Sequence, residues 1–412
     1  MTAAEPFQIQ AFGATHVGQV RSRNEDKYLI DASINLFIVC DGMGGHAAGD
    51  VASDLASRLV GTYLREHRQQ IASAGNRPDG DYQVLRLAEQ AVEHASTQLY
   101  QMARSDTDCS GMGTTLTLLV IVGDKGVMAH VGDSRLYLRR NQKVHQLSSD
   151  HTLANELVQG GMLSPQDSRE SRYNHILTRS IGPQTSVEVE TLLFDLLPGD
   201  VFLLCTDGLT KYVDEEDEIL EVLSHEITEQ SARQLVETAN RKGGADNITV
   251  IVVEVQPRPD AAVLNSDEFQ RRLDVMKSVF LFRGLSLSRL MRLMNIAKCQ
   301  QYQAGERIFS EGETGRQLSI VLSGTVTYGP TTYRAGDSFG EASVFCDERM
   351  HFDLVAEQAV ELLSIEGADF QALTRRFPKL GRRLLSVLAR HLSEQLQIAR
   401  EAGEDLLDTW TE

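Results

Sequence analysis

The sequence predicts an α+β protein in two parts: a β-sandwich flanked by helices, followed by a small β jelly roll with helices. Three observations predict this fold class. Runs with strand and helix periodicity alternate from residue 7 to about residue 255. Two prolines then interrupt the pattern within residues 256–260, where the last strand-like run has ended. Beyond them, short apolar runs punctuated by glycine lie between amphipathic helical stretches, a pattern typical of a jelly roll.

The elements of the first part follow from two periodicities. Apolar residues recur at helical spacing at residues 47–66, 84–104, 153–159 and 231–241. The β-branched run 113–122 breaks at a glycine-containing turn and resumes over 127–138, which predicts a hairpin, and a turn at Asn141-Gln142 extends it into a meander. Further strands are predicted at 187–193, 201–205 and 248–255. Many antiparallel strands with helices outside them favour layered sheets.

The prolines predict a linker between two domains. We expect a first domain over residues 1–256, a linker over 257–272 and a second domain over 273–412. A length of 412 residues fits this division, because a domain usually holds roughly 150 residues. The second domain should open with a helical stretch at 273–297, continue as short strands within 303–365 and close with a helix that reaches about residue 402.

The composition is that of a globular protein, with 42% hydrophobic and 24% charged residues. A formal charge of −18 argues against non-specific binding to nucleic acid or to an anionic membrane, because phosphate groups repel such a surface. No apolar stretch approaches the roughly 18 residues that span a bilayer. The five cysteines show no CxxC pair, so we predict reduced, buried thiols and a cytoplasmic location.

Aspartates beside glycine or asparagine lie at the ends of several strand-like runs. Asp41 and Asp207 each follow such a run, and Asp246 precedes one. A single Asp-Gly is usually a turn, but turn chemistry does not explain the same arrangement at several strand ends. Carboxylates crowded at the mouth of a β-core repel one another unless cations lie between them. The pattern therefore predicts a site for hard divalent metals with oxygen ligands.

Such a site suits the hydrolysis of a phosphate monoester. Two cations roughly 3.5–4 Å apart lower the pKa of water and neutralise charge as it attacks phosphorus. Asp41 is the best candidate to bridge the cations, because the carbonyl of Gly42 can approach the second ion without a side chain in the way. Asp207 and Asp246 would complete the protein ligands of the first ion.

Charged residues upstream complete the predicted site. Glu25 and Asp26 are placed to accept hydrogen bonds from metal-bound waters. Arg21 would grip two phosphate oxygens with its planar fork, which gives orientation as well as charge.

With these residues, the first domain resembles the metal-dependent serine/threonine protein phosphatases of the type 2C class. The resemblance spans about residues 7–255 and rests on motifs at 21–26, 41–45, 110–115, 132–135, 150–151, 177–179, 206–208 and 246–247. It implies a β-sandwich flanked by helices, two Mn²⁺ or Mg²⁺ ions, and hydrolysis of phosphoserine or phosphothreonine without a covalent intermediate. It also implies that Asp41 bridges the ions and that Asp133 helps to hold a third, weaker ion, as in bacterial members.

The sequence departs from many eukaryotic members after the Asp-Gly pair. They have a histidine there, proposed as general acid for the leaving group, whereas this chain has Met43, whose thioether donates no proton. The proton must come from metal-bound water or another group. His46 is a candidate, although a helix-start residue is the simpler interpretation. Residues 153–173 resemble the family's flap, which we expect to be mobile and to carry substrate preference.

Residues 273–397 resemble the cyclic-nucleotide-binding fold of the catabolite activator protein and kinase regulatory subunits. The resemblance rests on 302–309, 311–313, 320–326 and 335–341. Gly340 and Glu341 match the family's contacts to cyclic phosphate and ribose, but Met350 stands at the position of the phosphate-binding arginine, with Arg349 one residue early. Losing that partner costs on the order of 1.5–3 kcal/mol. Two interpretations stay open: a sensor of cAMP or cGMP that uses Arg349, and an interaction module.

Leucines at four-residue spacing follow the predicted jelly roll at Leu380, Leu384, Leu388 and Leu392. Such a stripe usually packs on its own domain. In this fold, however, the corresponding long helix often pairs with a twin, so a homodimer through the C-terminal domain is our hypothesis.

Two functions from different classes follow. The first is a phosphatase that acts on phosphorylated protein substrates with a metal-activated water and is regulated by the sensor domain. The second is a catalytically idle scaffold that binds phosphoproteins or a nucleotide and signals by docking. The intact set of aspartates favours the first.

Overall fold

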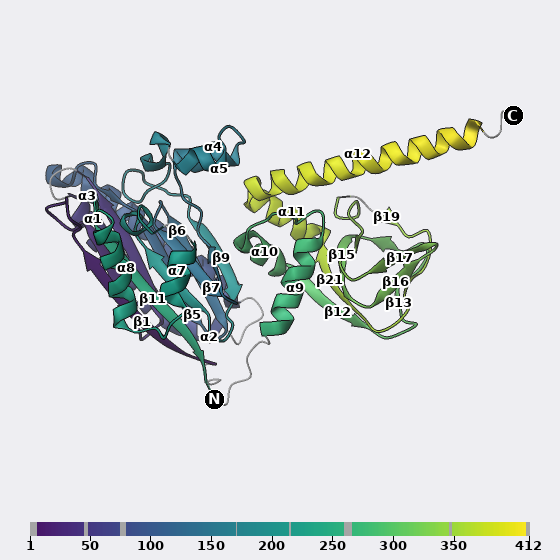
Figure 1. Cartoon of the computed structure of the whole chain (residues 1–412), viewed down its shortest axis with the longest axis horizontal. Coiled ribbons are helices and arrows are strands. Elements are labelled where there is room, and N and C mark those ends of the chain that lie inside the picture. The colour runs from purple at the N-terminus through teal and green to yellow at the C-terminus, as the bar shows by residue number, and fades with distance from the viewer. Residues whose placement is uncertain are drawn as a thin grey trace. The chain divides into compact units, whose positions relative to one another are not determined.

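The computed structural model contains two compact units, Met1–Ser266 and Asp267–Glu412 (Figure 1). It describes residues 6–44, 48–74, 80–169, 171–213, 216–258, 266–345 and 348–408. Of the helices in these ranges, none is both long and apolar enough to cross a lipid bilayer.

The first unit is a sandwich of two antiparallel sheets, as the sequence predicted. One sheet has the order β1 (Phe7–His16), β11 (Ile248–Pro257), β10 (Val201–Cys205), β7 (Arg135–Arg140) and β8 (Lys143–Gln146). The other has the order β2 (Asp26–Asp31), β3 (Leu36–Met43), β5 (Leu116–Val122), β6 (Lys125–Val131) and β9 (Glu190–Asp195). The short strand β4 (Gly113–Thr114) also pairs with β3.

Alternation along the strands explains the sandwich. In β3, Leu36 and Ile38 join the core beneath the helices, while Phe37 is buried on the opposite face of the strand. Phe194 of β9 and Phe202 of β10 meet with ring centroids 5.6 Å apart. Their contact joins the two sheets face to face.

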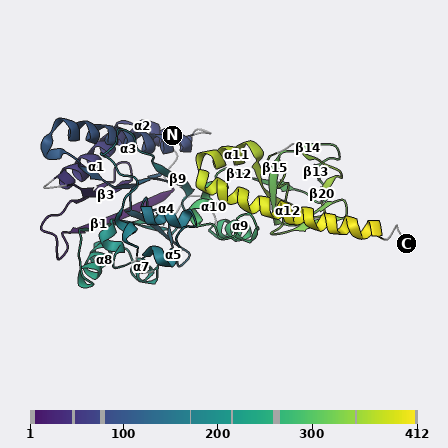
Figure 2. The same cartoon turned by 90° about the horizontal axis from the view of Figure 1, so that it is seen from above.

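Helices cover the outer faces of both sheets, on opposite sides of the strands in Figure 2. The core beneath the β2–β9 sheet includes residues of α1 (Ala48–Glu66), α2 (Arg68–Ala74) and α3 (Gly80–Ser105). The core of the β1–β8 sheet includes residues of α6 (Asp207–Thr210), α7 (Glu216–Leu223) and α8 (Glu229–Arg241). The segment predicted as the flap contains α4 (Leu153–Gln159), α5 (Pro165–Arg169) and the 3₁₀-helix η2 (Arg172–His175).

The first and last strands of this unit pair with each other. Strands β1 and β11 align antiparallel along their full lengths, from Phe7 opposite Pro257 to His16 opposite Ile248. Segments from both ends of the first unit therefore lie side by side where the candidate site is built.

The strand predicted through residue 138 is instead two strands. Strand β6 ends at Val131 and β7 begins at Arg135, and the two belong to different sheets. Gly132 between them has a φ of 112°, a conformation that L side chains rarely adopt. The break leads the chain from one sheet to the other and places Asp133 at the crossing.

The second unit is a β-rich domain with helices before and after the strands. One four-stranded sheet has the order β12 (Ala297–Tyr302), β21 (Val360–Glu366), β15 (Gln317–Ser323) and β18 (Ser338–Phe339). The other has the order β13 (Arg307–Phe309), β20 (Leu354–Ala356), β16 (Thr325–Tyr328) and β17 (Thr331–Arg334). Strands β14 (Thr314–Gly315) and β19 (Glu348–Arg349) form a separate ribbon.

Two helical predictions in this unit were too long. The stretch 273–297 divides into α9 (Ser266–Ser278) and α10 (Leu287–Met294), with Gly284 at a φ of 72° between them. The start of α9 lies inside the range 257–272 predicted as linker. The closing stretch divides into α11 (Gly367–Arg376) and α12 (Pro378–Asp408), because proline fits the first position of a new helix but not the interior of an old one.

The cysteines are mostly interior. Cys40, Cys109 and Cys205 are buried free thiols, as predicted, whereas Cys299 is exposed. Cys299 lies on β12, an edge strand of its sheet, which corrects the prediction that it is buried. Cys346 falls outside the described residues.

Candidate metal centre

Pairing of β2 with β3 sets Asp26 directly opposite Asp41. Residues opposite each other in an antiparallel pair project from the same face of the sheet, so the two carboxyl groups are neighbours. Burial raises the pKa of Asp41 well above its usual range, and the charges of Asp26, Asp207, Asp133 and Asp246 raise it further. Four carboxylates from distant parts of the sequence therefore lie close enough to Asp41 to oppose its ionisation.

Two threonines fix the backbone of Asp41. Its carbonyl accepts hydrogen bonds from the Thr115 amide and the Thr114 hydroxyl, both at 2.9 Å, and its amide donates to the Thr115 hydroxyl at 3.0 Å. The Thr115 hydroxyl also shares a hydrogen bond of 2.7 Å with that of Ser134. These bonds connect Asp41 to residues 132–134 between β6 and β7, the crossing loop, which carries Asp133.

Gly42 allows the end of strand β3 to touch the start of helix α1. A Cβ atom at residue 42 would lie 2.1 Å from the carbonyl oxygen of Gly49 and 2.6 Å from that of Glu25. Neither contact is tolerable, because both partners are backbone atoms. The Glu25 side chain lies in the same place, since a Cβ at residue 49 would be 2.9 Å from its Cδ.

Asp207 and Asp246 converge on one cation of the protein itself. Asp207 begins α6, and the Lys211 ammonium lies 2.8 Å from Oδ2 of Asp207 and 2.8 Å from Oδ2 of Asp246. Burial acts to raise the pKa of Asp246, but the hydrogen bond and charge of Lys211, together with hydrogen bonds from the Asn247 amide and Arg21, hold that pKa below its ordinary value. The two carboxylates thus lie within reach of a single ion.

The donor set fits divalent metal ions. Oδ1 of Asp207 and Oδ1 of Asp26 are buried oxygens that have no hydrogen-bond partner. The other oxygen of Asp26 accepts from the Thr206 hydroxyl at 2.8 Å, and burial raises the pKa of Asp26 to about 7. Buried carboxylate oxygens without partners are costly, and hard cations such as Mg²⁺ and Mn²⁺ prefer oxygen ligands.

Arg21 lies at the edge of this cluster. Its guanidinium contacts both carboxylate oxygens of Asp246, Nε at 2.9 Å from Oδ1 and one terminal nitrogen at 2.9 Å from Oδ2. About half of the Arg21 side chain is exposed, 52%. The predicted phosphate clamp is therefore at the cluster with its fork engaged by a carboxylate, and its role toward phosphate stays a prediction.

Asn247 is a residue whose part in the site the sequence analysis did not recognise. Its side-chain nitrogen Nδ2 donates to the carbonyls of Val17 and Arg23, at 2.9 and 2.8 Å. Its side-chain oxygen accepts from the backbone amide of Glu25 at 2.8 Å. One side chain therefore holds the segment with Arg21 and Glu25 against Asp246. The available signal was the Asp-Asn pair before a strand, because asparagine can donate and accept at once.

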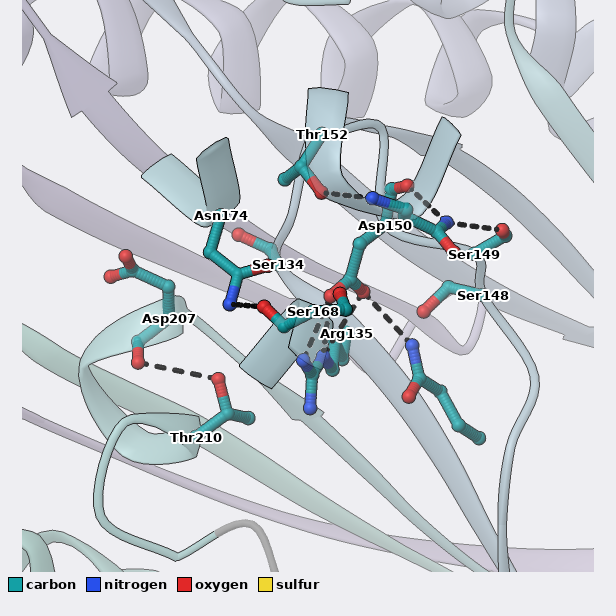
Figure 3. Close-up of polar contacts among 12 residues, drawn as sticks. Ser134, Arg135, Ser148, Ser149, Asp150, Thr152, Ser168, Asn174, Asp207 and Thr210 are labelled. Carbon is teal, nitrogen blue, oxygen red and sulfur yellow. Dashed lines mark hydrogen bonds and ion pairs between the residues drawn. The ribbon is translucent and has the colours of Figure 1, made fainter. Parts of the chain in front are cut away.

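The crossing loop with Asp133 is held from the other side by residues 150–151. Arg135 forms a forked ion pair with Asp150, with contacts of 2.8–3.1 Å (Figure 3). His151 binds Gly132 twice, through its backbone amide at 2.7 Å and through Nδ1, which accepts from the Gly132 amide at 3.1 Å. Burial and the charges of Asp207 and Asp150 raise the pKa of Asp133 to about 7.

Three further side chains lie as close together as metal ligands. The ligand atoms of His130, His151 and Glu190 are all within 4.8 Å of one another. Nδ1 of His151 accepts from a backbone amide, so in the neutral ring Nε2 carries the proton and is not free to bind a metal. Nδ1 of His130 shares a 2.9 Å hydrogen bond with Thr117. Of the three, His151 supports the crossing loop through its contact with Gly132.

The flap predicted from the sequence contains two short helices and a 3₁₀-helix. A β-bridge between Thr152 and Leu177 closes its base, and the Asn174 side chain donates to the Ser168 carbonyl at 2.5 Å (Figure 3). Met162 and Ile176 are exposed on it. The mobility of the flap stays a prediction. His46, the candidate proton donor for the leaving group, falls outside the described residues.

The second unit holds the residues predicted for a nucleotide. Gly340 has a φ of 80°, and a Cβ there would lie 2.3 Å from the Gln317 carbonyl. The Glu341 carboxylate accepts from the Ser338 hydroxyl at 2.7 Å. Arg349 pairs through its backbone with Thr314 in the β14–β19 ribbon. Within the described part of the chain, no hydrogen bond or ion pair joins Arg349 to Glu341, so their joint role stays a prediction.

The sequence matches two known families. Residues 12–245 match the family described as "Protein phosphatase 2C", and residues 299–377 match "Cyclic nucleotide-binding domain". The chain is 36% identical over 244 residues to the serine/threonine phosphatase stp of Listeria innocua, which covers 58% of this chain and 93% of that protein. It is 35% identical over 245 residues to protein phosphatase PhpP of Streptococcus pneumoniae, covering 58% and 95%.

Solved structures agree with the phosphatase match. The crystal structure of the Mycobacterium tuberculosis serine/threonine phosphatase PstP/Ppp is similar with a TM-score of 0.54 at 31% identity, over 60% of this chain and 99% of that one. The catalytic domain of serine/threonine protein phosphatase PstP in complex with two manganese ions gives a TM-score of 0.50 at 33% identity, over 60% and 98%.

Proposed function

Because the chain belongs to the protein phosphatase 2C family, we propose that its carboxylate cluster is the site where phosphoserine and phosphothreonine in proteins are hydrolysed. The chain is a metal-dependent serine/threonine protein phosphatase. The observation that carries the choice of site is the convergence of Asp26, Asp133, Asp207 and Asp246 around Asp41, with buried carboxylate oxygens that have no partner. Cations bound among these carboxylates would offset their mutual repulsion.

The proposed cofactors are two Mn²⁺ or Mg²⁺ ions. Asp41 would be shared between them, with Gly42 contributing its carbonyl, while Asp207 and Asp246 would serve one ion and Asp133 a third, weaker one. Their oxygen donors suit these metals. When bound, the ions would supply an acidified water and neutralise charge on phosphate.

The surrounding residues would then orient the substrate. Arg21 is half exposed beside Asp246, where its fork could exchange carboxylate oxygens for two phosphate oxygens. Glu25 and Asp26 would accept hydrogen bonds from waters of the cluster. We also propose that the enzyme acts on phosphorylated proteins in the cytoplasm.

Removal of metal tests this proposal. Full-length protein dialysed against EDTA should lose turnover of a phosphothreonine peptide and of para-nitrophenyl phosphate, and added Mn²⁺ should restore both. Circular dichroism of the dialysed protein should stay that of a folded chain, so that the loss reports the metal. Turnover that persists without metal, or none with Mn²⁺, would instead favour the idle scaffold that docks phosphoproteins.

We propose that the second unit regulates the first as a ligand sensor. The proposed domain limits are those predicted from the sequence: 1–256 for the first domain, 257–272 for the linker and 273–412 for the second domain. The match to the cyclic-nucleotide-binding family supports a sensor. Gly340, Glu341 and Arg349 are the candidates to meet cAMP or cGMP. Calorimetry with each nucleotide on the full chain, together with the phosphatase rate, is the test. No heat and no change of rate with either nucleotide would leave an interaction module as the better description.

We also propose a homodimer through α12. Of the predicted leucine stripe, Leu380, Leu384 and Leu388 are buried within the unit, whereas Leu392 is exposed. A second stripe at seven- and four-residue spacing, formed by Leu385, Leu392 and Leu396, is exposed along the same helix. Apolar side chains at this spacing are typical of helix pairing.

Charge introduced into the exposed stripe should break that dimer. In sedimentation at micromolar concentration, wild type should be dimeric, and Leu392→Glu combined with Leu396→Glu should be monomeric, because the glutamates would have to be buried without partners. Gln397→Glu, which lies off the stripe, should leave the dimer intact. A wild-type protein that sediments only as monomer contradicts the proposal.

A further inference from the structure

Lys211 occupies an unusual place for a lysine in this site. It follows the last residue of α6, one helical turn after Asp207, and its amide donates to the Asp207 carbonyl at 2.9 Å. From there its ammonium reaches Oδ2 of Asp207 and Oδ2 of Asp246, each at 2.8 Å. The same side chain thus neutralises both aspartates that are candidates to bind one metal ion.

The position of Lys211 is fixed by its surroundings. The neighbouring Tyr212 hydroxyl accepts from the Ala245 amide at 3.1 Å, and a Cβ at Gly208 would lie 1.8 Å from the Asn247 carbonyl. Helix α6 is therefore held against the loop that carries Asp246. Only 27% of the Lys211 side chain is exposed, so its charge acts within the cluster and is incompletely screened by water.

The charge of Lys211 also extends to the crossing loop. Its electrostatic effect reaches Asp133, the third-ion candidate. Asp246 already carries the Arg21 fork on its two oxygens. A divalent ion that enters between Asp207 and Asp246 therefore meets an ammonium at hydrogen-bonding distance from both ligands, and like charges at such distance repel.

We propose that Lys211 is an internal counter-cation of the metal centre, which stabilises the cluster of aspartates when metal is scarce and competes with a divalent ion for Asp207 and Asp246. The inference rests on the proposed function only in taking these aspartates as metal ligands. Lys211 would act as a positioning residue that sets the metal concentration at which the site fills. The effect is read from metal binding and melting, so it is separable from whether phosphate esters are hydrolysed.

Removal of this charge should lower the stability of the metal-free protein and increase its affinity for metal. Without metal, full-length Lys211→Gln should melt about 2–4 °C below wild type, because its aspartates lose their partner. In calorimetric titration with Mn²⁺, the same variant should bind with a Kd lowered about tenfold or more, or take up an additional ion, because the competing charge is gone.

Two further variants separate charge from shape. Lys211→Arg keeps the charge and should keep the wild-type Kd for Mn²⁺ within about threefold. Lys143→Gln removes the same charge on β8, opposite Arg140 at the far end of β7 from Asp133, and should match wild type in both measurements. The proposal is overturned by a Lys211→Gln variant that binds Mn²⁺ as wild type or more weakly, and also by Lys211→Arg binding as tightly as Lys211→Gln.

Discussion

Asp41→Asn is expected to abolish phosphatase activity while making the metal-free protein more stable. The activity, measured as kcat/KM on a phosphothreonine peptide with saturating Mn²⁺, should fall by about a thousandfold or more, since loss of even one preorganised electrostatic contact in an active site costs about 10²–10³. The amide has the shape of the carboxylate but cannot bridge two cations.

The stability gain follows from the crowding of charge at Asp41. Burial and four neighbouring carboxylates raise the pKa of Asp41, so the folded protein holds this proton more tightly than the unfolded chain does. Stability is therefore lost as pH rises from the ordinary carboxyl range towards the raised pKa. At neutral pH the asparagine removes that cost, and the metal-free melting temperature should rise by about 2–4 °C.

Asp54→Asn is the matched control for this prediction. Asp54 lies on helix α1, is 44% exposed and forms an ion pair with Arg58 four residues later. Such a surface pair contributes about 0.3–0.5 kcal/mol at most, so activity and melting should both stay near wild type. An Asp41→Asn enzyme with more than a tenth of wild-type kcat/KM, or one that melts earlier than wild type without metal, contradicts the assignment.

Arg140→Met is expected to have the largest effect on the stability of the first unit. The Arg140 and Asp200 side chains are 4% and 1% exposed and form a forked pair at 2.8 and 2.5 Å. Arg140 also donates to the Asp195 carbonyl at 2.8 Å. Methionine would leave the Asp200 carboxylate buried without its cation, a loss of about 3–5 kcal/mol.

The urea midpoint for loss of phosphatase activity measures this loss in the first unit alone. Arg140→Met combined with Asp200→Leu should recover much of the stability, because no uncompensated charge then remains in the interior. Arg233→Met, which breaks an exposed pair with Glu229, should shift the midpoint little. A loss below about 1 kcal/mol in Arg140→Met, within the range of an exposed pair, would show that water reaches Asp200.

Local pattern was enough to predict many elements. Strand 201–205 and helix 153–159 have the predicted limits, because the first is a continuous apolar run and the second an amphipathic one, each with turn-forming residues on both sides. The crossing at Gly132 was missed because strand-like residues lie on both sides of the short segment 132–135, and the prediction joined them into one strand. Gly132 marks a local break, but the assignment of β6 and β7 to different sheets depends on distant parts of the chain.

The candidate site shows the same division between local and distant information. Asp41, Asp207 and Asp246 could be selected because aspartates beside glycine or asparagine recur at strand ends. Lys211 and Asn247 could not be assigned contacts, since these depend on how α6 and the loop before β11 meet. A lysine four residues after an aspartate is common on helix surfaces, so its spacing alone predicts an ordinary surface pair.

The pairing of β1 with β11 has a consequence for the folding of this enzyme during translation. In a nascent chain that has emerged only as far as β10, the strand that pairs with β1 is still missing, and so is Asp246. Contacts between such distant residues form slowly, because the intervening chain must first be brought together. Catalytic competence should therefore arrive in one late step, once residue 257 has left the exit tunnel, and translation halted earlier should yield only inert fragments.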